Sequence, residues 1–377
     1  MAEALIMAES VYIDGKWSVG SGDTITNYCP ATGEKVWDGL SADRGEVNSA
    51  VSSARTAFKD WSRRPQGERT SILEAYAEEI GKRTDAIAET ISRDMGKALW
   101  ESQSEAATMK AKVAVSVGAQ VERAGSRFQD TPFGSAHLTH RPHGVMAVYG
   151  PFNFPGHLPN GHIVPALLAG NTCVFKPSEL APGVAALMAE AFQAAGLPDG
   201  CLNIVHGARD TGAGLLKSDI DGLLFTGSAA TGVFFHKYFA GRPEVILALE
   251  MGGNNPLIVW EPAEVEAAAD IAAQSAFLTT GQRCSCARRV ILPEGNFGDA
   301  IVEAIIARAK SLRIGAWNEE DVFMGPLVSE KAASSATEFQ TMLSKKGGKT
   351  LRRLKRLQRG GGFVTAGVID VTDAADA

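Results

Sequence analysis

The chain has 377 residues, of which 45% are hydrophobic and 21% charged, and its formal net charge is −6. This length predicts two or more domains, and the composition is that of a water-soluble globular protein, which excludes wholesale disorder and a small disulfide scaffold. The negative charge gives no general attraction for nucleic acid or an anionic membrane, so neither is an expected partner.

Five cysteines are scattered along the chain without a CxxC pair. This odd set favours reduced thiols in a cytoplasmic protein over a disulfide framework or a zinc site. The first ten residues lack the pattern of a secretory signal, and no segment approaches the ~20 apolar residues that a membrane-spanning helix needs. We therefore expect a cytoplasmic protein that binds no metal ion and does not enter a membrane.

Helical periodicity dominates the N-terminal region. We expect helices over residues 46–63 and 68–97, separated near Pro65, because apolar residues in the second segment recur at intervals that fit one helical face. The segment 120–142 is polar and lacks this periodicity. We interpret it as an excursion from the fold, such as a hairpin.

From about residue 144 the chain changes to short apolar runs bounded by Gly, Pro, Ser or Asn. Such runs are typical of buried strands, and helical segments are expected between most of them, over 157–170, 182–195 and 229–240. The alternation predicts an α/β fold with a doubly wound parallel sheet, whose ligands bind where strands end and the chain turns into a helix. A further helix to about residue 280, a strand and a helix near 297–312 predict a second α/β domain.

Cys284 lies in Gly-Gln-Arg-Cys-Ser-Cys, directly after an expected helix and near Arg283, Arg288 and Arg289. A free cysteine is mostly protonated at neutral pH, and neighbouring cations or a helix end increase its reactive thiolate fraction. Cys284 is therefore a candidate nucleophile. A buried structural thiol is the alternative.

Two other strand ends carry groups suited to acyl chemistry. Glu250 closes an apolar run before two glycines, where desolvation would move its pKa toward neutrality and allow it to act as a base toward a thiol or a water molecule. Asn153, in Pro-Phe-Asn-Phe-Pro-Gly, is suited to donate to an oxyanion. A glutamate that only caps a loop and a merely rigid turn are the respective alternatives.

Two more strand ends suit a dinucleotide. Glycines let the backbone approach a pyrophosphate, and a lysine with a carboxylate can hold ribose hydroxyls. The GxGxxG fingerprint is absent, so each motif is weak alone, but their order and spacing are distinctive together. The residues are Lys176, Ser178 and Glu179 after one strand, and Gly227, Ser228 and Gly232 after another.

In this order, the motifs PFNFP, KPSE, FTGSAATG, LEMGG and GQRCSCARR resemble the aldehyde dehydrogenase superfamily, from about residue 11 to the C-terminus. The segments around PFNFP, LEMGG and GQRC are most similar to the branch that oxidises N-succinylglutamate 5-semialdehyde in arginine catabolism. The resemblance implies the aldehyde dehydrogenase fold. Its NAD-binding domain would comprise residues 1–119 and 143–252, with an oligomerisation excursion over 120–142 and a catalytic domain over 253–377.

The resemblance also implies roles for the site residues. Cys284 attacks the aldehyde, Asn153 and the Cys284 backbone N–H hold the oxyanion, and Glu250 activates the water that hydrolyses the thioester. NAD is the implied cofactor, since a carboxylate at Glu179 would repel the 2′-phosphate of NADP. The family forms homo-oligomers. Contacts to the cofactor are implied for Phe152, Lys176, Ser178, Glu179, Gly227, Ser228 and Gly232.

An acidic aldehyde would need local cations on a chain of negative charge. Arg283, Arg288 and Arg289 are the candidates for binding it, with His157 and His162 behind them. For each, a structural salt bridge or a polar surface is the alternative.

Members of the superfamily generally continue beyond the position of Ala377, so we expect a catalytic domain that is incomplete at its C-terminus. Two alternatives therefore stand beside the main hypothesis: a dehydrogenase for another acidic semialdehyde, and a non-catalytic chain of the same fold. A cysteine hydrolase fits poorly, because no histidine partner for Cys284 is evident in the sequence.

Overall fold

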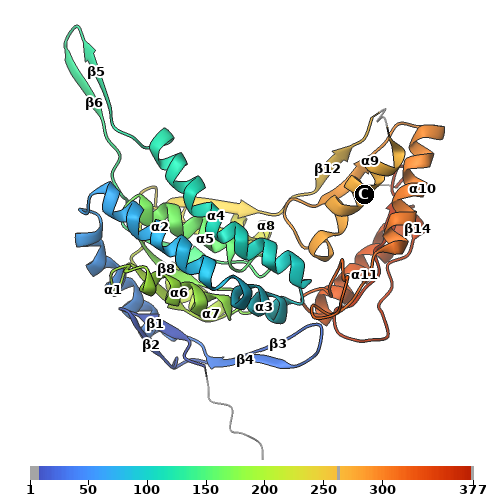
Figure 1. Ribbon diagram of the computed structural model, residues 1–377, viewed down its shortest axis with the longest axis horizontal. Helices are drawn as coiled ribbons and strands as arrows, with labels where there is room; N and C mark the ends of the chain where they lie inside the picture. The colour runs from blue at the N-terminus through green and yellow to red at the C-terminus, as the bar shows by residue number, and fades with distance from the viewer. Residues whose placement is uncertain (1–7, 261–263, 375–377) are drawn as a thin grey trace, which may run out of the picture. The chain divides into compact units, whose positions relative to one another are not determined.

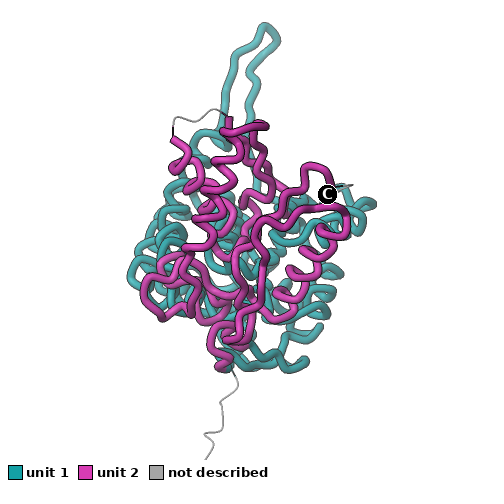
Figure 2. The backbone as a smooth tube through the Cα atoms, turned by 90° about the vertical axis from the view of Figure 1, so that its right-hand side faces the viewer, with its two compact units in different colours: residues 1–27, 35–91, 102–251 teal, residues 28–34, 92–101, 252–377 magenta. Residues whose placement is uncertain are grey.

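The computed structural model describes residues 8–260 and 264–374. The chain divides into two compact units (Figure 2). Unit 1 comprises Met1–Asn27, Lys35–Ile91 and Ser102–Met251, and unit 2 comprises Tyr28–Glu34, Ser92–Glu101 and Gly252–Ala377. Unit 1 thus ends one residue before the boundary expected at residue 252, while two short N-terminal segments belong to unit 2. That the units correspond to a cofactor domain and a catalytic domain stays a prediction.

Unit 1 is built on a seven-stranded sheet in the order β11-β10-β7-β8-β9-β1-β2. Five strands are parallel, as expected, and each coincides with an apolar run of the sequence. The sequence does not predict the two short strands at one edge, β1 and β2, which are antiparallel. The seven strands are β1 (Val11–Ile13), β2 (Lys16–Ser18), β7 (Val145–Tyr149), β8 (Thr172–Lys176), β9 (Leu202–Val205), β10 (Gly222–Gly227) and β11 (Ile246–Met251).

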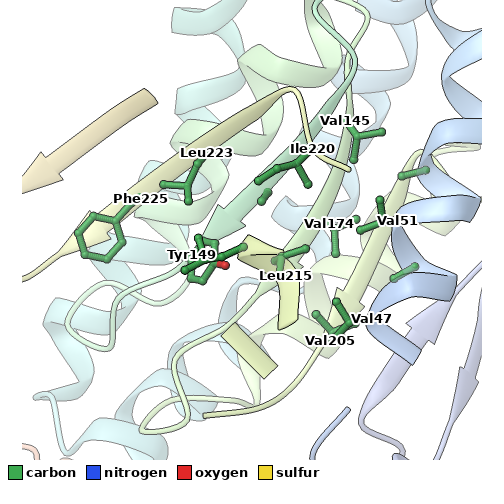
Figure 3. Packing of buried hydrophobic residues seen from close by; sticks show 14 of the residues in the cluster. Val47, Val51, Val145, Tyr149, Val174, Val205, Leu215, Ile220, Leu223 and Phe225 are labelled. Atoms are coloured by element: carbon green, nitrogen blue, oxygen red, sulfur yellow. The ribbon is translucent and has the colours of Figure 1, made fainter. Parts of the chain in front are cut away.

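Helices cover both faces of this sheet (Figure 1). On one face, α1 (Arg44–Trp61), α7 (Arg209–Leu216) and α8 (Ala229–Tyr238) enclose a core to which β7, β8, β9 and β10 contribute alternate side chains. Figure 3 shows this packing, with Val47 and Val51 of α1 against strand residues such as Val174 and Val205. The sheet also contacts α5 (His157–Leu168) and α6 (Val184–Ala194), which in turn pack against α2 (Gln66–Lys82).

The helix expected over residues 68–97 is two helices, α2 (Gln66–Lys82) and α3 (Thr84–Met95). Arg83 ends α2 with non-helical dihedral angles, and the Thr84 hydroxyl donates back to the carbonyls of Ile80 and Gly81. The apolar periodicity continues without interruption through this break, so the sequence pattern does not reveal that one helix ends and another begins. The six residues that define the periodicity are all buried: Leu73, Tyr76, Ile80, Ile87, Ile91 and Met95.

The expected excursion contains a hairpin of β5 (Arg127–Thr131) and β6 (Gly134–Leu138), which projects away from the sheet (Figure 1). It follows the long helix α4 (Leu99–Arg123), whose last turn occupies the start of the segment 120–142. Every residue of both strands is exposed, including Phe128. A separate pair, β3 (Thr24–Tyr28) and β4 (Lys35–Leu40), was not predicted.

Unit 2 has a small α/β core, as expected, formed by two parallel strands and two helices. A further helix packs with Leu327, which precedes it, and with Leu354 and Val364, which lie between the two strands of an antiparallel pair. The sequence analysis predicts neither this helix nor these two strands. The elements are β12 (Asn255–Ile258), α9 (Val265–Phe277), the 3-10 helix η1 (Leu278–Gly281), β13 (Ala287–Ile291), α10 (Asn296–Ser311), α11 (Glu330–Lys345), β14 (Lys349–Arg352) and β15 (Val368–Asp370).

Candidate active site

The strand order of unit 1 reverses between β7 and β10. From β7 the parallel strands run through β8 to β9, whereas β10 returns to the other side of β7. In open α/β sheets such a switch point opens a crevice at the carboxyl ends of the strands, where ligands bind. Tyr149 at the end of β7 is paired with Lys176 on β8 and with Phe225 on β10, and Thr226 is paired with Glu250 on β11. The strand-end motifs therefore leave the sheet at one edge.

The loop after β7 is fixed at both ends. Its first residue, Gly150, donates a 3.0 Å hydrogen bond from its backbone N–H to the carbonyl of Lys176. At its far end, the buried carboxylate of Glu105 accepts from the backbone N–H groups of Gly156 and His157, each at 3.0 Å, at the N-terminus of α5. Between these anchors, Phe152 and Asn153 are partly exposed. Sequence analysis missed Glu105, because nothing local relates it to a loop some 50 residues away.

Lys176 is almost buried, and its ammonium group joins two strand-end loops. Its Nζ donates to the carbonyls of Pro177 at 2.8 Å and Gly207 at 2.7 Å and lies 3.7 Å from the carboxylate of Glu179. Burial lowers the pKa of Lys176, and the charge of Glu179 opposes this shift. Glu179 is exposed, and Ser178 accepts a hydrogen bond from the Leu180 backbone N–H. The pair thus presents a carboxylate to solvent beside a fixed ammonium group.

The other dinucleotide motif forms the N-terminus of α8. Ser228 is the N-cap, and its Oγ accepts from the backbone N–H of Thr231 at 3.2 Å. Gly227, the last residue of β10, lies just before this cap, and the helix start is exposed. Gly232 is buried, and a Cβ there would lie 2.3 Å from the Sδ of Met251 at the end of β11. Its lack of a side chain therefore allows α8 to pack closely on the sheet.

Two expectations for the end of β11 and its surroundings are wrong. Glu250 is exposed, so it is not the desolvated carboxylate that the sequence analysis expects. His162 is not a cation for an acidic substrate, because burial, with a smaller effect from Lys112, lowers its pKa to about 4. Its Nε2 lies 2.9 Å from the Thr226 hydroxyl, next to Glu250 in the sheet register. His157 contributes a backbone N–H to the Glu105 cap.

Cys284 belongs to unit 2, where it lies in the loop between η1 and β13. Of the five cysteines, all within the described ranges, it alone is exposed. Asn255, the first residue of β12, donates from Nδ2 to the Cys284 carbonyl at 2.6 Å and to the Cys286 carbonyl at 3.2 Å. Burial raises the pKa of the Cys286 thiol, which argues against a reactive role for this neighbour. Cys284 is the accessible thiol of the loop.

The chain just before Cys284 has an unusual backbone. Thr279 and Thr280, with φ of 54° and 57°, and Gly281, with φ of 72°, form three consecutive residues in the left-handed region. The buried carboxylate of Glu101 accepts from the Thr279 hydroxyl at 2.8 Å and its backbone N–H at 3.2 Å. Sequence analysis missed Glu101, which is 178 residues from Thr279 along the chain.

The three arginines near Cys284 have different environments. Arg283 donates from Nη2 to Glu101 at 2.7 Å and from Nε to the Thr279 hydroxyl at 2.7 Å, so the structural salt bridge left open by the sequence analysis describes it. Arg288 and Arg289 are exposed, and each donates one hydrogen bond to a backbone carbonyl of a loop, that of Arg283 and that of Asn254. Because a guanidinium carries five donors, both retain capacity for an anion.

Comparison with known proteins places this geometry in a family. The family model described as "Aldehyde dehydrogenase family" matches residues 17–377. The chain belongs to the aldehyde dehydrogenase family. As a member of this family, it is an NAD(P)-dependent aldehyde dehydrogenase and has the aldehyde dehydrogenase fold.

Relatives and solved structures of this family cover most of the chain. It is 54% identical, over 97% of its length and 76% of the relative, to N-succinylglutamate 5-semialdehyde dehydrogenase 2 of Caulobacter vibrioides. The chain is also 48% identical, over 97% of its length and 76% of the relative, to N-succinylglutamate 5-semialdehyde dehydrogenase of Paraburkholderia xenovorans. An aldehyde dehydrogenase of Mycobacterium tuberculosis, solved as a complex with NAD+, has a TM-score of 0.91 and 28% identity, covering 96% of this chain and 76% of that one.

The described residues of this aldehyde dehydrogenase contain neither a candidate membrane-spanning helix nor a candidate metal site. None of its described helices is both long and apolar enough to span a bilayer. Within residues 8–260 and 264–374, no three or more His, Cys, Asp or Glu side chains gather as a metal site.

Proposed function

We propose that this aldehyde dehydrogenase oxidises N-succinyl-L-glutamate 5-semialdehyde to N-succinyl-L-glutamate with NAD, in arginine catabolism. The observation that supports this choice of substrate is the 54% sequence identity, over 97% of the chain, to a relative whose name states this reaction. The same motifs would serve another acidic semialdehyde, which is the alternative.

The residues at the switch point fit a dinucleotide. The exposed N-terminus of α8, capped by Ser228, supplies backbone N–H groups and a helix dipole for a pyrophosphate. Gly227 lies directly before this cap, where a Cβ would lie 2.4 Å from the Phe225 ring. Lys176 and Glu179 would hold the adenine ribose, with Ser178 beside them and Phe152 nearer the nicotinamide. Gly232 contributes by letting α8 approach β11. NAD supplies the acceptor for the hydride when it is bound.

In the proposed chemistry, the Cys284 thiolate, whose proton is lost to solvent, attacks the carbonyl carbon of the aldehyde through its sulfur. The carbonyl oxygen becomes an oxyanion, which the Asn153 side-chain amide and the Cys284 backbone N–H stabilise; losing one such donor typically costs ~2.7 to 4 kcal/mol of transition-state stabilisation. Departure of the hydride leaves a thioester on Cys284. The exposure of Cys284, against the burial of the other four cysteines, supports its role as the nucleophile.

Hydrolysis of the thioester completes the cycle. Glu250 takes a proton from water, the resulting hydroxide attacks the thioester carbon, and the carbon–sulfur bond breaks to give the carboxylic acid and the thiolate. The solvent exposure of Glu250 supports this role, because a base for water needs access to water. Arg288 would pair with a carboxylate of the substrate; Arg283, which is bound to Glu101, is assigned instead to the architecture of the loop.

We also propose a cytoplasmic homo-oligomer. The free thiols of all five cysteines support a reducing compartment. The β5–β6 hairpin supports assembly, because its exposed apolar side chains find no cover within unit 1. These are Phe128, Phe133 and Leu138.

The experiment that tests the substrate is a panel of aldehydes assayed on the purified chain by absorbance of NADH. We expect the succinylated semialdehyde to give the highest kcat/KM with NAD, ahead of shorter acidic semialdehydes and uncharged aldehydes. A higher kcat/KM for a different acidic semialdehyde would show that the proposed substrate is wrong, while the proposed cysteine chemistry would still stand. No NADH formation with any aldehyde would contradict both.

A further inference from the structure

The turn before Cys284 adopts a conformation that its residues disfavour. Thr279 and Thr280 are β-branched, and both have the positive φ that such residues rarely adopt. Glycine, which tolerates this region, occupies only the third position, Gly281. Strained backbone of this kind persists only where surrounding contacts determine it, and it gathers at functional sites. The contacts that hold this turn therefore bear on the loop that carries the nucleophile.

Glu101 provides the central contact. Its side chain is fully buried in the first turn of α4, where the helix dipole favours a negative charge. Oε2 accepts from the Thr279 backbone N–H, while Oε1 accepts from the Thr279 hydroxyl and from Arg283 Nη2. A buried carboxylate needs such partners to offset its lost hydration. Glu101 is thus bound to the strained residue both directly and through Arg283.

Short connections join this cluster to Cys284. Arg283 precedes Cys284 in the chain, and its Nε donates to the same Thr279 hydroxyl at 2.7 Å. The carbonyl of Thr279 accepts from the Gln282 backbone N–H at 3.0 Å and from Gln282 Nε2 at 3.1 Å. On the other side, the Thr280 hydroxyl donates to the Gly325 carbonyl. A change in the Thr279 conformation would therefore shift the backbone of Cys284, including the N–H assigned to the oxyanion.

We propose that Glu101 is a positioning residue, which holds Thr279 and Arg283 so that the Cys284 loop keeps the geometry for attack on the aldehyde. The expected effect of Glu101 on catalysis rests on the proposed function. Its effect on the conformation of the Cys284 loop does not depend on that function. Glu101 touches no reacting atom in this account and acts through Thr279 and Arg283.

The test compares Glu101→Gln with Glu79→Gln. Glu79 forms another Glu–Arg pair, with Arg83 on α2, and its side chain is only 16% exposed, so the control removes a similar charge elsewhere. We expect Glu101→Gln to speed amide hydrogen exchange in residues 279–286 by about tenfold or more and to lower kcat roughly 10- to 100-fold. The KM for NAD should stay within about twofold, because the cofactor motifs lie on other loops.

A second substitution separates positioning from general stability. Glycine adopts a positive φ at little cost, so in a Thr279→Gly background the turn needs Glu101 less. The loss of kcat caused by Glu101→Gln should therefore be several-fold smaller in that background than in the wild type. If Glu101→Gln does not fold, Glu101→Asp, which keeps the charge and withdraws the oxygens by one methylene, takes its place under the same criteria.

Unchanged exchange in residues 279–286, or losses equal to those of Glu79→Gln, would overturn the proposal. So would an equal loss of kcat in the two Thr279 backgrounds. Hydrogen exchange is measured without substrate and therefore does not depend on the proposed function. If the wild-type chain lacks the proposed activity, the function is contradicted, but the exchange data still decide whether Glu101 holds the loop.

Discussion

The Asn255 side-chain amide lies 2.6 Å from the backbone carbonyl oxygen of Cys284, to which it donates a hydrogen bond. The same nitrogen also reaches the Cys286 carbonyl at 3.2 Å, so one residue at the start of β12 spans the cysteine loop. Glu101 holds the turn that precedes this loop through Thr279. The backbone around the nucleophile is therefore fixed by side chains from two distant parts of the sequence.

Replacing Asn255 should impair the reaction more than the fold. Asn255→Ala removes both hydrogen bonds, and the resulting freedom of the loop should lower kcat roughly tenfold, since small displacements of a catalytic group carry large costs. The neighbouring Asn254→Ala is the matched control, because Asn254 contributes its backbone carbonyl, which accepts from Arg289, and this carbonyl survives the change. Equal kcat values for the two variants in steady-state NADH assays would exclude a role for the Asn255 amide.

Glu250→Gln should separate the two halves of the reaction. The amide cannot take a proton from water, so the thioester should form and then persist. We expect a burst of NADH close to one equivalent per active chain, followed by steady-state turnover at least about 100-fold slower than wild type. Stopped-flow absorbance measures both phases. Steady-state turnover at the wild-type rate would remove Glu250 from the mechanism.

Glu179 should set the preference for NAD. Its exposed carboxylate lies 3.7 Å from the Lys176 ammonium group and would repel the 2′-phosphate of NADP. Glu179→Gln removes the charge and should raise kcat/KM for NADP relative to NAD by about tenfold or more. The control is Glu190→Gln, which changes an exposed glutamate of α6 and should leave this ratio unchanged. Ratios of kcat/KM for the two cofactors provide the measurement. A ratio that does not move in Glu179→Gln would mean that another group selects the cofactor.

His162 should make the fold sensitive to mild acid. Burial lowers its pKa from 6.5 to about 4, so below pH 6.5 the unfolded chain binds a proton that the folded chain does not. Stability contributed by neutral His162 is thus full above pH 6.5 and is lost as the pH falls toward 4, by at most about 3 kcal/mol. Buried His206, whose pKa is also lowered by burial, acts in the same direction.

The variant His162→Gln should therefore flatten the fall of the unfolding free energy between pH 6.5 and 4.5, as followed by urea denaturation at several pH values. His137→Gln, in the exposed β5–β6 hairpin, controls for the simple loss of an imidazole. If the slopes of wild type and His162→Gln coincide, the buried histidine does not account for the acid sensitivity.

The sequence predicts the parallel part of the fold well, because each of its strands is a short apolar run and each strand end carries a turn signal. β7 and β10, for example, end just before the expected loop segments that contain Asn153 and Ser228. The short strand β1 is different, because it has only three residues and joins the sheet by pairing with β9, about 190 residues later, as well as with its neighbour β2. The pairing with β9 leaves no local pattern.

The candidate site divides in the same way. Cys284, Glu250 and the Lys176–Glu179 pair are visible because their residue types are unusual in their local setting. Glu101 and Asn255 carry no such signal, since one is an acid in the first turn of a helix and the other an asparagine after glycines. The sequence makes Arg283 a candidate substrate cation because it does not reveal the buried partner of this residue, Glu101. Positioning groups of this kind are found from contacts.

The central claim, that the sulfur of Cys284 becomes acylated, is tested most directly by peptide mass mapping. Glu250→Gln protein is mixed with NAD and the succinylated semialdehyde, quenched in acid and digested, and the modified residue is identified by fragmentation. We predict a succinylglutamyl thioester on Cys284 and an unmodified Cys286. NADH formation without any adduct on Cys284, or with the adduct on another residue, would contradict it.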